Sequence, residues 1–227
     1  MQTLNAIHGS QIPAAIALRG AANLPPRTQP TVSGTRRTFD RGAEIFAEGE
    51  PCSVFFKVVS GTVRTGKLLA DGRRQIDTFH FPGDVFGLES GEAHRFTAEA
   101  VDKVVVVAYR RGSFGGLVQS DPAFGEQLMT SMLSNLERAH DHMVLLGRKT
   151  ALEKMASFLL EIAARRANAD QAELSMQRTD IADHLGLTIE TVSRTLTQMV
   201  RDGLIRLAGA GRTVILADKP ALRRLCA

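Results

Sequence analysis

Three polar residues at positions 190, 193 and 194 have the spacing that places side chains on one face of a helix. Arg194 can donate two hydrogen bonds to the O6 and N7 atoms of a guanine, and Glu190 can accept one from a cytosine amino group. Ser193 can bond a neighbouring base edge or a phosphate, and Ile189 offers an apolar surface suited to a thymine methyl. The four residues form a candidate surface for reading base edges in double-stranded DNA.

The residues around this surface predict two short helices joined by a tight turn. Thr179 is expected to cap the first helix, and Gly186 permits the positive φ that ends it. Thr188 is expected to cap the second helix. The apolar residues expected to face inward are Ile181, Ala182, Leu185, Val192, Leu196 and Met199. This arrangement is typical of a helix-turn-helix.

Basic and hydroxyl side chains near the two helices are candidates for phosphate contacts. Strands are expected at 205–207 and 213–216, around a glycine-rich wing. The candidates for DNA phosphate are Arg178, Thr179, Thr191, Arg206 and Arg212. For each arginine alone, a solvated surface charge is an equally good interpretation.

The chain divides by composition into four segments of an α+β protein. Residues 1–38 hold four of the eight prolines and are expected to form a loose N-terminal arm. Residues 39–120 contain glycines between short β-rich runs (54–59, 77–81 and 104–109), which favours an antiparallel β-roll. A long helix is expected at 121–150, and the winged helix-turn-helix at 151–227. That last part carries 8 basic and 5 acidic side chains within positions 177–227, which suits a phosphate backbone.

An apolar seam runs along the expected long helix. It consists of Met129, Met132, Leu136, Ala139, Met143 and Leu146, with alternating spacings of three and four residues. A helix of this length spans roughly 40 Å, more than a small roll covers. We therefore expect the seam to pair with a second copy and form a homodimer. In the alternative, the helix packs only on its own roll.

The reading segment resembles the recognition motif of the Crp/Fnr family of bacterial regulators, whose Glu-x-x-Ser-Arg signature stands here at Glu190, Ser193 and Arg194. The tract 185–194 looks most like the Fnr and FixK branches, the latter linked with nitrogen fixation. The resemblance covers residues 39–218. It implies a cyclic-nucleotide-binding-like roll, an inverted TTGAT-n4-ATCAA palindrome, and activation through contact with RNA polymerase.

The segments that hold effectors in this family differ here. Nucleotide-binding members have Gly-Glu-Leu and then Arg-Ser or Arg-Thr, where the Glu holds the ribose and the Arg holds the cyclic phosphate. Here Leu88 stands at the position of that Glu, and Arg95 is followed by Phe96. Oxygen-sensing members use N-terminal cysteines for an iron–sulfur cluster, and none precedes Cys52. We therefore expect no cofactor, with a roll that binds an unidentified small molecule as the alternative.

Other functional classes find little support in the sequence. Cys52 and Cys226 are the only cysteines, too few for a cluster, although either could undergo redox modification. Cys226 is expected to be exposed. The histidines do not have metal-ligand spacing, and no motif of an enzyme active site occurs. No apolar run is long enough to span a membrane, so we expect a cytoplasmic protein.

Overall fold

The computed structural model describes residues 34–165 and 169–226, all of which belong to one compact unit. Most of the predicted N-terminal arm lies outside the described residues. Its last residues do not belong to an arm, because β1 (Thr35–Phe39) pairs with a strand of the roll. The predicted boundary at residue 39 is therefore too late. β1 is an edge strand with exposed side chains, so its polar composition does not reveal the backbone pairing that holds it.

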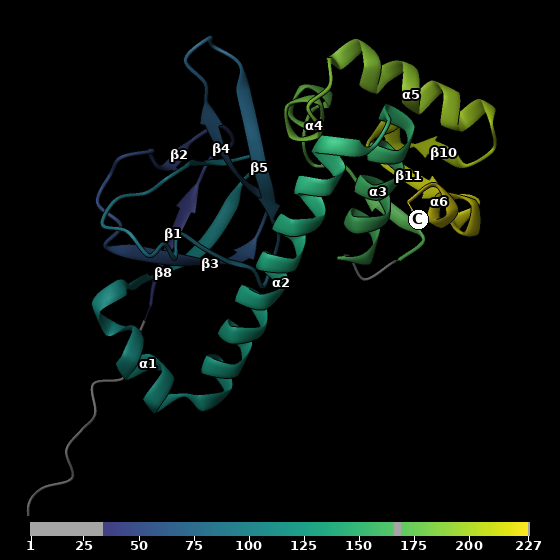
Figure 1. Cartoon of the computed structure of the whole chain (residues 1–227). Helices are drawn as coiled ribbons and strands as arrows, with labels where there is room; N and C mark the ends of the chain where they lie inside the picture. Colours follow the sequence, from purple (N-terminus) through teal and green to yellow (C-terminus); the bar gives the residue numbers. More distant parts are fainter. Residues whose placement is uncertain (1–33, 166–168, 227) are drawn as a thin grey trace, which may run out of the picture. The chain divides into compact units, whose positions relative to one another are not determined.

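The predicted antiparallel roll is confirmed, and it consists of two four-stranded sheets (Figure 1). Its strands are β1, β2 (Glu44–Phe46), β3 (Val54–Ser60), β4 (Val63–Leu68), β5 (Arg74–His80), β6 (Val85–Phe86), β7 (Thr97–Ala100) and β8 (Val104–Arg110). One sheet has the order β1-β8-β3-β6 and the other β2-β7-β4-β5. Strands β3, β5 and β8 lie where the β-rich runs predicted them.

Alternating side chains fill the space between the two sheets. In β8, Val104, Val106 and Ala108 are buried while the residues between them are half-buried. They pack with Phe46, Phe56, Val58, Val63, Phe86, Ala98 and Ala100. Gly61, between β3 and β4, has a φ of +85°, and a Cβ there would lie 2.5 Å from the carbonyl oxygen of Lys103. Only glycine fits this turn.

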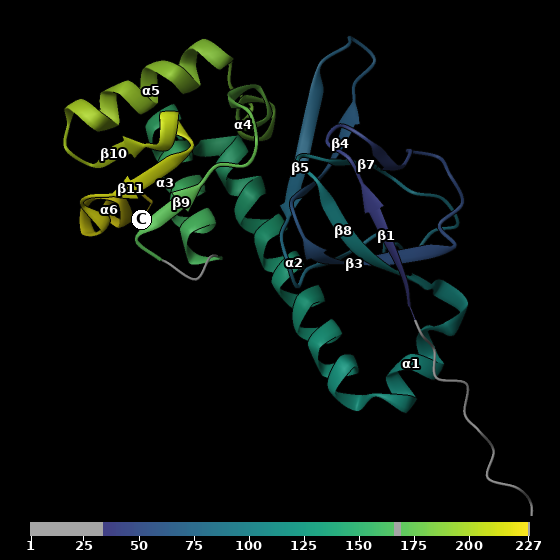
Figure 2. The same cartoon turned by 180° about the vertical axis from the view of Figure 1, so that it is seen from behind.

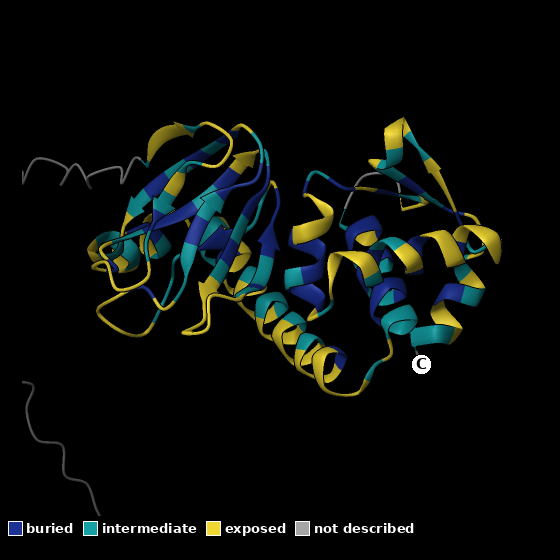
Figure 3. Ribbon diagram, turned by 90° about the horizontal axis from the view of Figure 1, so that it is seen from above, coloured by how far each residue is buried: buried dark blue, intermediate teal, exposed yellow. Residues whose placement is uncertain are grey.

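The long helix follows the roll. A short 3-10 turn (Arg111–Ser113) and α1 (Phe114–Ser120) lead into α2 (Pro122–Arg148). Asp121 caps α2 by accepting a hydrogen bond from the N–H of Phe124 at 3.0 Å, and Pro122 fits the first helical turn. Only Leu128 and Leu145 of α2 are buried, so most of its surface is exposed (Figure 3).

The C-terminal part is a winged helix-turn-helix, as predicted (Figure 2). Its elements are α3 (Ala151–Ala164), β9 (Gln171–Glu173), α4 (Arg178–Leu185), α5 (Ile189–Arg201), β10 (Ile205–Ala208), a 3-10 turn (Gly209–Gly211), β11 (Thr213–Leu216) and α6 (Lys219–Cys226). The three strands form an antiparallel sheet in the order β10-β11-β9. Its core includes Phe158, Ile181, Leu196 and Val214. None of the helices within the described residues is long and apolar enough to cross a membrane.

Candidate nucleic-acid interface

The turn between α4 and α5 has the predicted geometry. Gly186 adopts the left-handed conformation, with φ 61° and ψ 44°, and the N–H of Leu187 donates to the carbonyl oxygen of Ala182 at 3.0 Å. Thr188 caps α5, because its hydroxyl oxygen accepts a hydrogen bond from the N–H of Thr191 at 3.2 Å. The six residues predicted to face inward are all buried. The helix-turn-helix therefore presents one fixed face of α5.

The predicted cap of α4 is wrong. Its N-cap is Gln177 rather than Thr179, and the N–H of Gln177 donates to a carboxylate oxygen of Asp180 at 3.1 Å. α4 begins earlier than predicted because the carboxylate at its third position satisfies the backbone of the residue before the helix. Thr179 lies exposed in the first turn.

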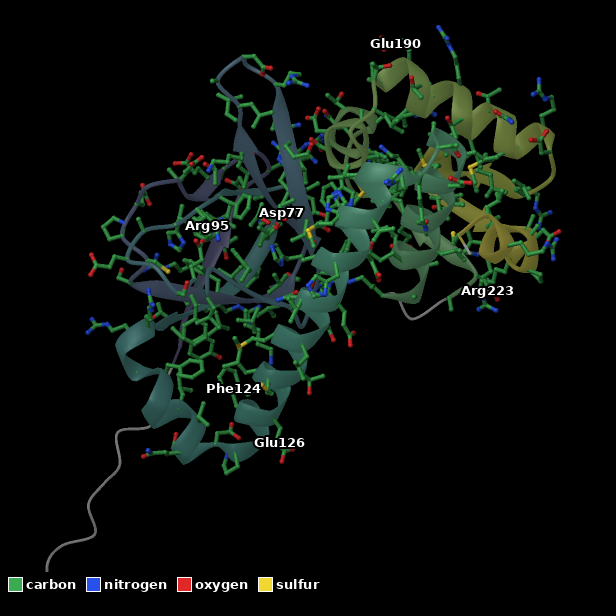
Figure 4. All side chains as sticks on the ribbon, viewed as in Figure 1. Asp77, Arg95, Phe124, Glu126, Glu190 and Arg223 are labelled. Carbon is green, nitrogen blue, oxygen red and sulfur yellow. The ribbon has the colours of Figure 1, made fainter. Side chains whose placement is uncertain are left out.

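The candidate base-reading side chains gather at the start of α5. Ile189, Glu190 and Arg194 are exposed and Ser193 is half-buried. Figure 4 shows Glu190 at the first turn of the helix. A hydrogen bond from its own backbone N–H and a second from Thr188 hold the pKa of Glu190 below its ordinary value, with a smaller contribution from Arg194. Glu190 is therefore a carboxylate at neutral pH, able to accept hydrogen bonds but not to donate one.

The structure reveals a link that the sequence spacing did not indicate. Arg178, at the start of α4, donates a hydrogen bond from its guanidinium to the hydroxyl oxygen of Ser193 at 3.3 Å. The two residues are fifteen positions apart, so only the angle between the two helices brings them together. Arg178 thereby orients one of the four candidate reading residues.

The remaining candidates for phosphate contact lie on β10, beside the wing turn and in the first turn of α5. Arg206 on β10 and Arg212, directly after the wing turn, are exposed. The wing turn uses three consecutive residues with positive φ, including Ala210 at 55°. Thr191 is half-buried, and its hydroxyl lies 3.1 Å from that of Thr188. The wing turn lies close to the start of α4, because a Cβ at Gly211 would be 3.7 Å from the guanidinium of Arg178.

The predicted seam of α2 is exposed along its whole length. Its six residues (Met129, Met132, Leu136, Ala139, Met143 and Leu146) all have accessible side chains, and Met143 is 64% exposed. Leu133 and Val144 are exposed beside them and were not predicted. Each directly follows a seam residue, so the apolar stripe is broader than the strict heptad pattern. Large exposed apolar patches mark interaction surfaces.

In the loop of the roll that resembles a nucleotide site, polar groups are bonded to one another. Glu89 accepts a hydrogen bond from the backbone N–H of Arg95 at 2.6 Å and pairs with Nδ1 of His94 at 3.2 Å. Leu88 and Phe96 line the neighbouring cavity of about 890 Å³. Arg95 is exposed and lines the same cavity. The backbone N–H of Arg95 is therefore already hydrogen-bonded to the carboxylate of Glu89.

Neither cysteine lies in a metal site within the described residues, where no cluster of three potential ligands occurs. Cys52 is buried, and its thiol donates to the carbonyl oxygen of Gly87 at 3.2 Å. Cys226 is half-buried rather than exposed as predicted, because the hydroxyl of Ser157 donates to its sulfur at 3.3 Å and α6 packs on α3.

Two family models match this chain. Residues 153–225 match the Crp-like helix-turn-helix domain, and residues 36–121 match the cyclic nucleotide-binding domain. The matched ranges coincide with the winged helix-turn-helix and with the roll, including β1.

Individual relatives and solved structures extend these matches over most of the chain. The nitrogen fixation regulation protein FixK of Azorhizobium caulinodans is 47% identical over 85% of this chain and 79% of its own length. FixK of Rhizobium meliloti is 39% identical, covering 86% and 90%. The structure of FixK2 from Bradyrhizobium japonicum is 45% identical, with a TM-score of 0.78 over 86% of this chain and 98% of that one.

Proposed function

The chain belongs to the Crp/Fnr family of transcription regulators, among relatives named FixK, and we propose that it reads an inverted TTGAT-n4-ATCAA palindrome as an effector-independent homodimer. The observation that carries the proposal is the exposed start of α5, where Ile189, Glu190 and Arg194 lie within the first two turns of a capped helix. The FixK relatives suggest that it regulates genes of the nitrogen-fixation type.

Base reading is assigned to the four residues at the start of α5. Arg194 donates both hydrogen bonds to the guanine of the half-site, and Glu190 accepts from a cytosine amino group on the other strand. Ile189 contacts a thymine methyl, and Ser193, whose oxygen accepts from Arg178, donates its hydroxyl hydrogen to a base edge or phosphate. The charge state of Glu190 and the exposure of Arg194 support these roles.

Phosphate binding is assigned to groups around that face. Arg178, Thr179 and Thr191 lie near the starts of α4 and α5, where backbone N–H groups and the helix dipole favour an anion. Arg206 on β10 and Arg212 beside the wing turn are assigned to phosphates of the DNA backbone. These contacts set the position of the protein on DNA without selecting a sequence.

Dimerisation is assigned to the exposed apolar stripe of α2. The six seam residues, with Leu133 and Val144, form a surface that is costly to leave in water. A second copy of α2 buries this stripe and pairs the two reading helices, as an inverted repeat requires. Activation through RNA polymerase contact remains a proposal drawn from the family.

Effector independence rests on the roll and on the cysteine content. Leu88 offers no acceptor for a ribose, and a cyclic phosphate would have to displace the carboxylate of Glu89 from the N–H of Arg95. The two cysteines are too few to hold an iron–sulfur cluster in one chain. We therefore assign control to the abundance of the protein rather than to a bound ligand.

One observation favours a second candidate, a ligand-gated regulator. The cavity of about 890 Å³ lies between β5, α2 and α3, and its lining includes Asp77, Arg138 and His142. Such a volume accommodates a small molecule with polar groups. Native mass spectrometry of the purified dimer separates the two candidates, because a ligand-gated protein retains a mass beyond that of its polypeptides.

Binding of the purified protein to a TTGAT-n4-ATCAA duplex, in air and with nothing added, tests the leading proposal. We expect affinity at least about 10³-fold above that for a scrambled duplex at the same salt concentration. Equal affinity for the two duplexes would contradict the assigned operator. A tenfold gain on adding cAMP, or iron in the active dimer, would contradict effector independence.

A further inference from the structure

The hairpin formed by β4 and β5 contacts α4 through a cluster of five charged side chains. Arg64 and Arg74 of the hairpin both donate to one carboxylate oxygen of Asp180, at 2.8 and 2.6 Å. Arg74 also donates to Asp183 at 2.8 Å, and Arg64 donates to Glu99 at 3.0 Å. The side chain of Asp180 is only 3% exposed. Two cations from the roll therefore converge on one buried anion of the helix-turn-helix.

Asp180 has a second role within the same contact. Its other carboxylate oxygen accepts the N–H of Gln177, which holds the start of α4. The first turn of α4 also carries Arg178, which bonds Ser193 on α5. Hydrogen bonds thus connect the arginines of the hairpin, through the start of α4, to the reading face.

Neutral contacts continue along the same side of the hairpin. The side chain of Gln75 donates to the carbonyl oxygen of His184 at 3.3 Å, and the ring of His184 lies 3.2 Å from the carbonyl oxygen of Ile76. Ile76 and Phe79 are buried in the same core as Ile181 and Leu185. β5 and α4 therefore form an interface of apolar, neutral polar and ionic contacts.

We propose that Arg64 and Arg74 are positioning residues for DNA binding. They hold α4 against the β4–β5 hairpin, so that α5 and the wing keep one orientation without an effector. They also neutralise Asp180 and Asp183, whose negative charges would otherwise act on the phosphates that approach the start of α4. Both effects raise the affinity for DNA, whatever its sequence.

The test compares two neighbouring arginines of the same hairpin. Arg74 pairs with α4, whereas Arg73 pairs with Asp71 of its own hairpin and is 77% exposed at the side chain. Affinity for the palindrome and for a scrambled duplex is measured by fluorescence anisotropy for wild type, Arg74→Ala and Arg73→Ala. We expect Arg74→Ala to lose about five- to tenfold on both duplexes, and Arg73→Ala to lose less than about twofold.

A double-mutant cycle with Asp183→Ala tests whether Arg74 acts through its pairing with α4, and hydrogen exchange in α4 separates positioning from simple loss of a positive charge. Arg74→Ala with Asp183→Ala should recover part of the affinity, because it leaves no unpaired carboxylate at position 183. Amide hydrogen exchange in α4 should be faster in Arg74→Ala than in wild type. Arg74→Lys, which keeps the charge, should have a DNA affinity and an exchange rate between those of wild type and Arg74→Ala. Equal DNA affinities of Arg74→Ala and Arg73→Ala, or tighter binding by Arg74→Ala than by wild type, would overturn the proposal. Because the loss is expected on both duplexes, this result does not depend on the assigned operator.

Discussion

The ammonium nitrogen of Lys154 lies 3.0 Å from the carbonyl oxygen of Leu185, so a side chain of α3 satisfies the last residue of α4. Both residues are buried. Burial lowers the pKa of Lys154. The carbonyl belongs to the end of a helix directly before Gly186, where backbone acceptors lack partners within the helix. The lysine thereby supports the turn that sets the direction of α5.

Lys154→Met should lower stability, because methionine fills a similar volume but leaves the carbonyl oxygen of Leu185 without this donor. We expect a decrease of about 1–3 kcal/mol in the free energy of unfolding, measured by urea denaturation. Lys103→Met, at an exposed position, is the matched control and should change stability by less than about 0.5 kcal/mol. Equal effects of the two substitutions would show that the Lys154 bond contributes little.

Two buried histidines should make the protein sensitive to acid. Burial lowers the pKa of His80 to about 4 and that of His184 to about 3, with a smaller contribution to His184 from His142. The unfolded chain takes up these protons near the ordinary value of 6.5. The unfolded state therefore binds more protons below that pH, and stability falls as the pH decreases from about 6.5 towards 3.

Each of these histidines should remove about 2 kcal/mol of the free energy of unfolding between about pH 7 and pH 5. His80→Gln should therefore show a smaller loss over this range than wild type in urea denaturation at the two pH values. His140→Gln, at an exposed position of α2, is the matched substitution and should keep the wild-type loss. An unchanged pH dependence in His80→Gln would contradict the burial argument.

Local patterns in the sequence predicted the helices and strands of the fold, but they did not predict the contacts between these elements. The Gly186 turn and the Thr188 cap follow from nearby residues, and both are confirmed. The position of Lys154 four residues before the buried Phe158 indicates that its side chain is buried too. Its hydrogen-bond partner, Leu185, is thirty-one residues away and could not be predicted from this spacing. The bond between Arg178 and Ser193 depends on an interhelical angle that no spacing encodes.

Leu136→Glu should separate the proposed dimer into monomers, because it places a charge at the centre of the apolar stripe of α2. Gln127→Glu introduces the same side chain at an exposed position that helical spacing puts on the opposite face of α2 from Leu136, and it should remain dimeric. Light scattering measures the mass of both variants, and circular dichroism checks that they are folded. A folded Leu136→Glu dimer would place the interface elsewhere.

Arg206→Ala should weaken binding to all DNA sequences by a similar factor, since the side chain is assigned to a phosphate. The slope of log affinity against log salt should become shallower by about one for each phosphate that the variant no longer neutralises. Anisotropy titrations of matched and scrambled duplexes at two salt concentrations measure both quantities. Loss confined to the palindrome would instead assign Arg206 to base reading.

The most direct measurement of the central claim compares wild type with Arg194→Ala on the palindrome and on a scrambled duplex at one salt concentration. Each bidentate pair with guanine discriminates by about 1–3 kcal/mol, and a dimer loses two of them together. We expect Arg194→Ala to lose most of its affinity for the palindrome and much less for the scrambled duplex, where other basic groups still bind phosphates. Equal losses on the two duplexes would contradict the account, because they would show that Arg194 holds phosphate rather than reading a base.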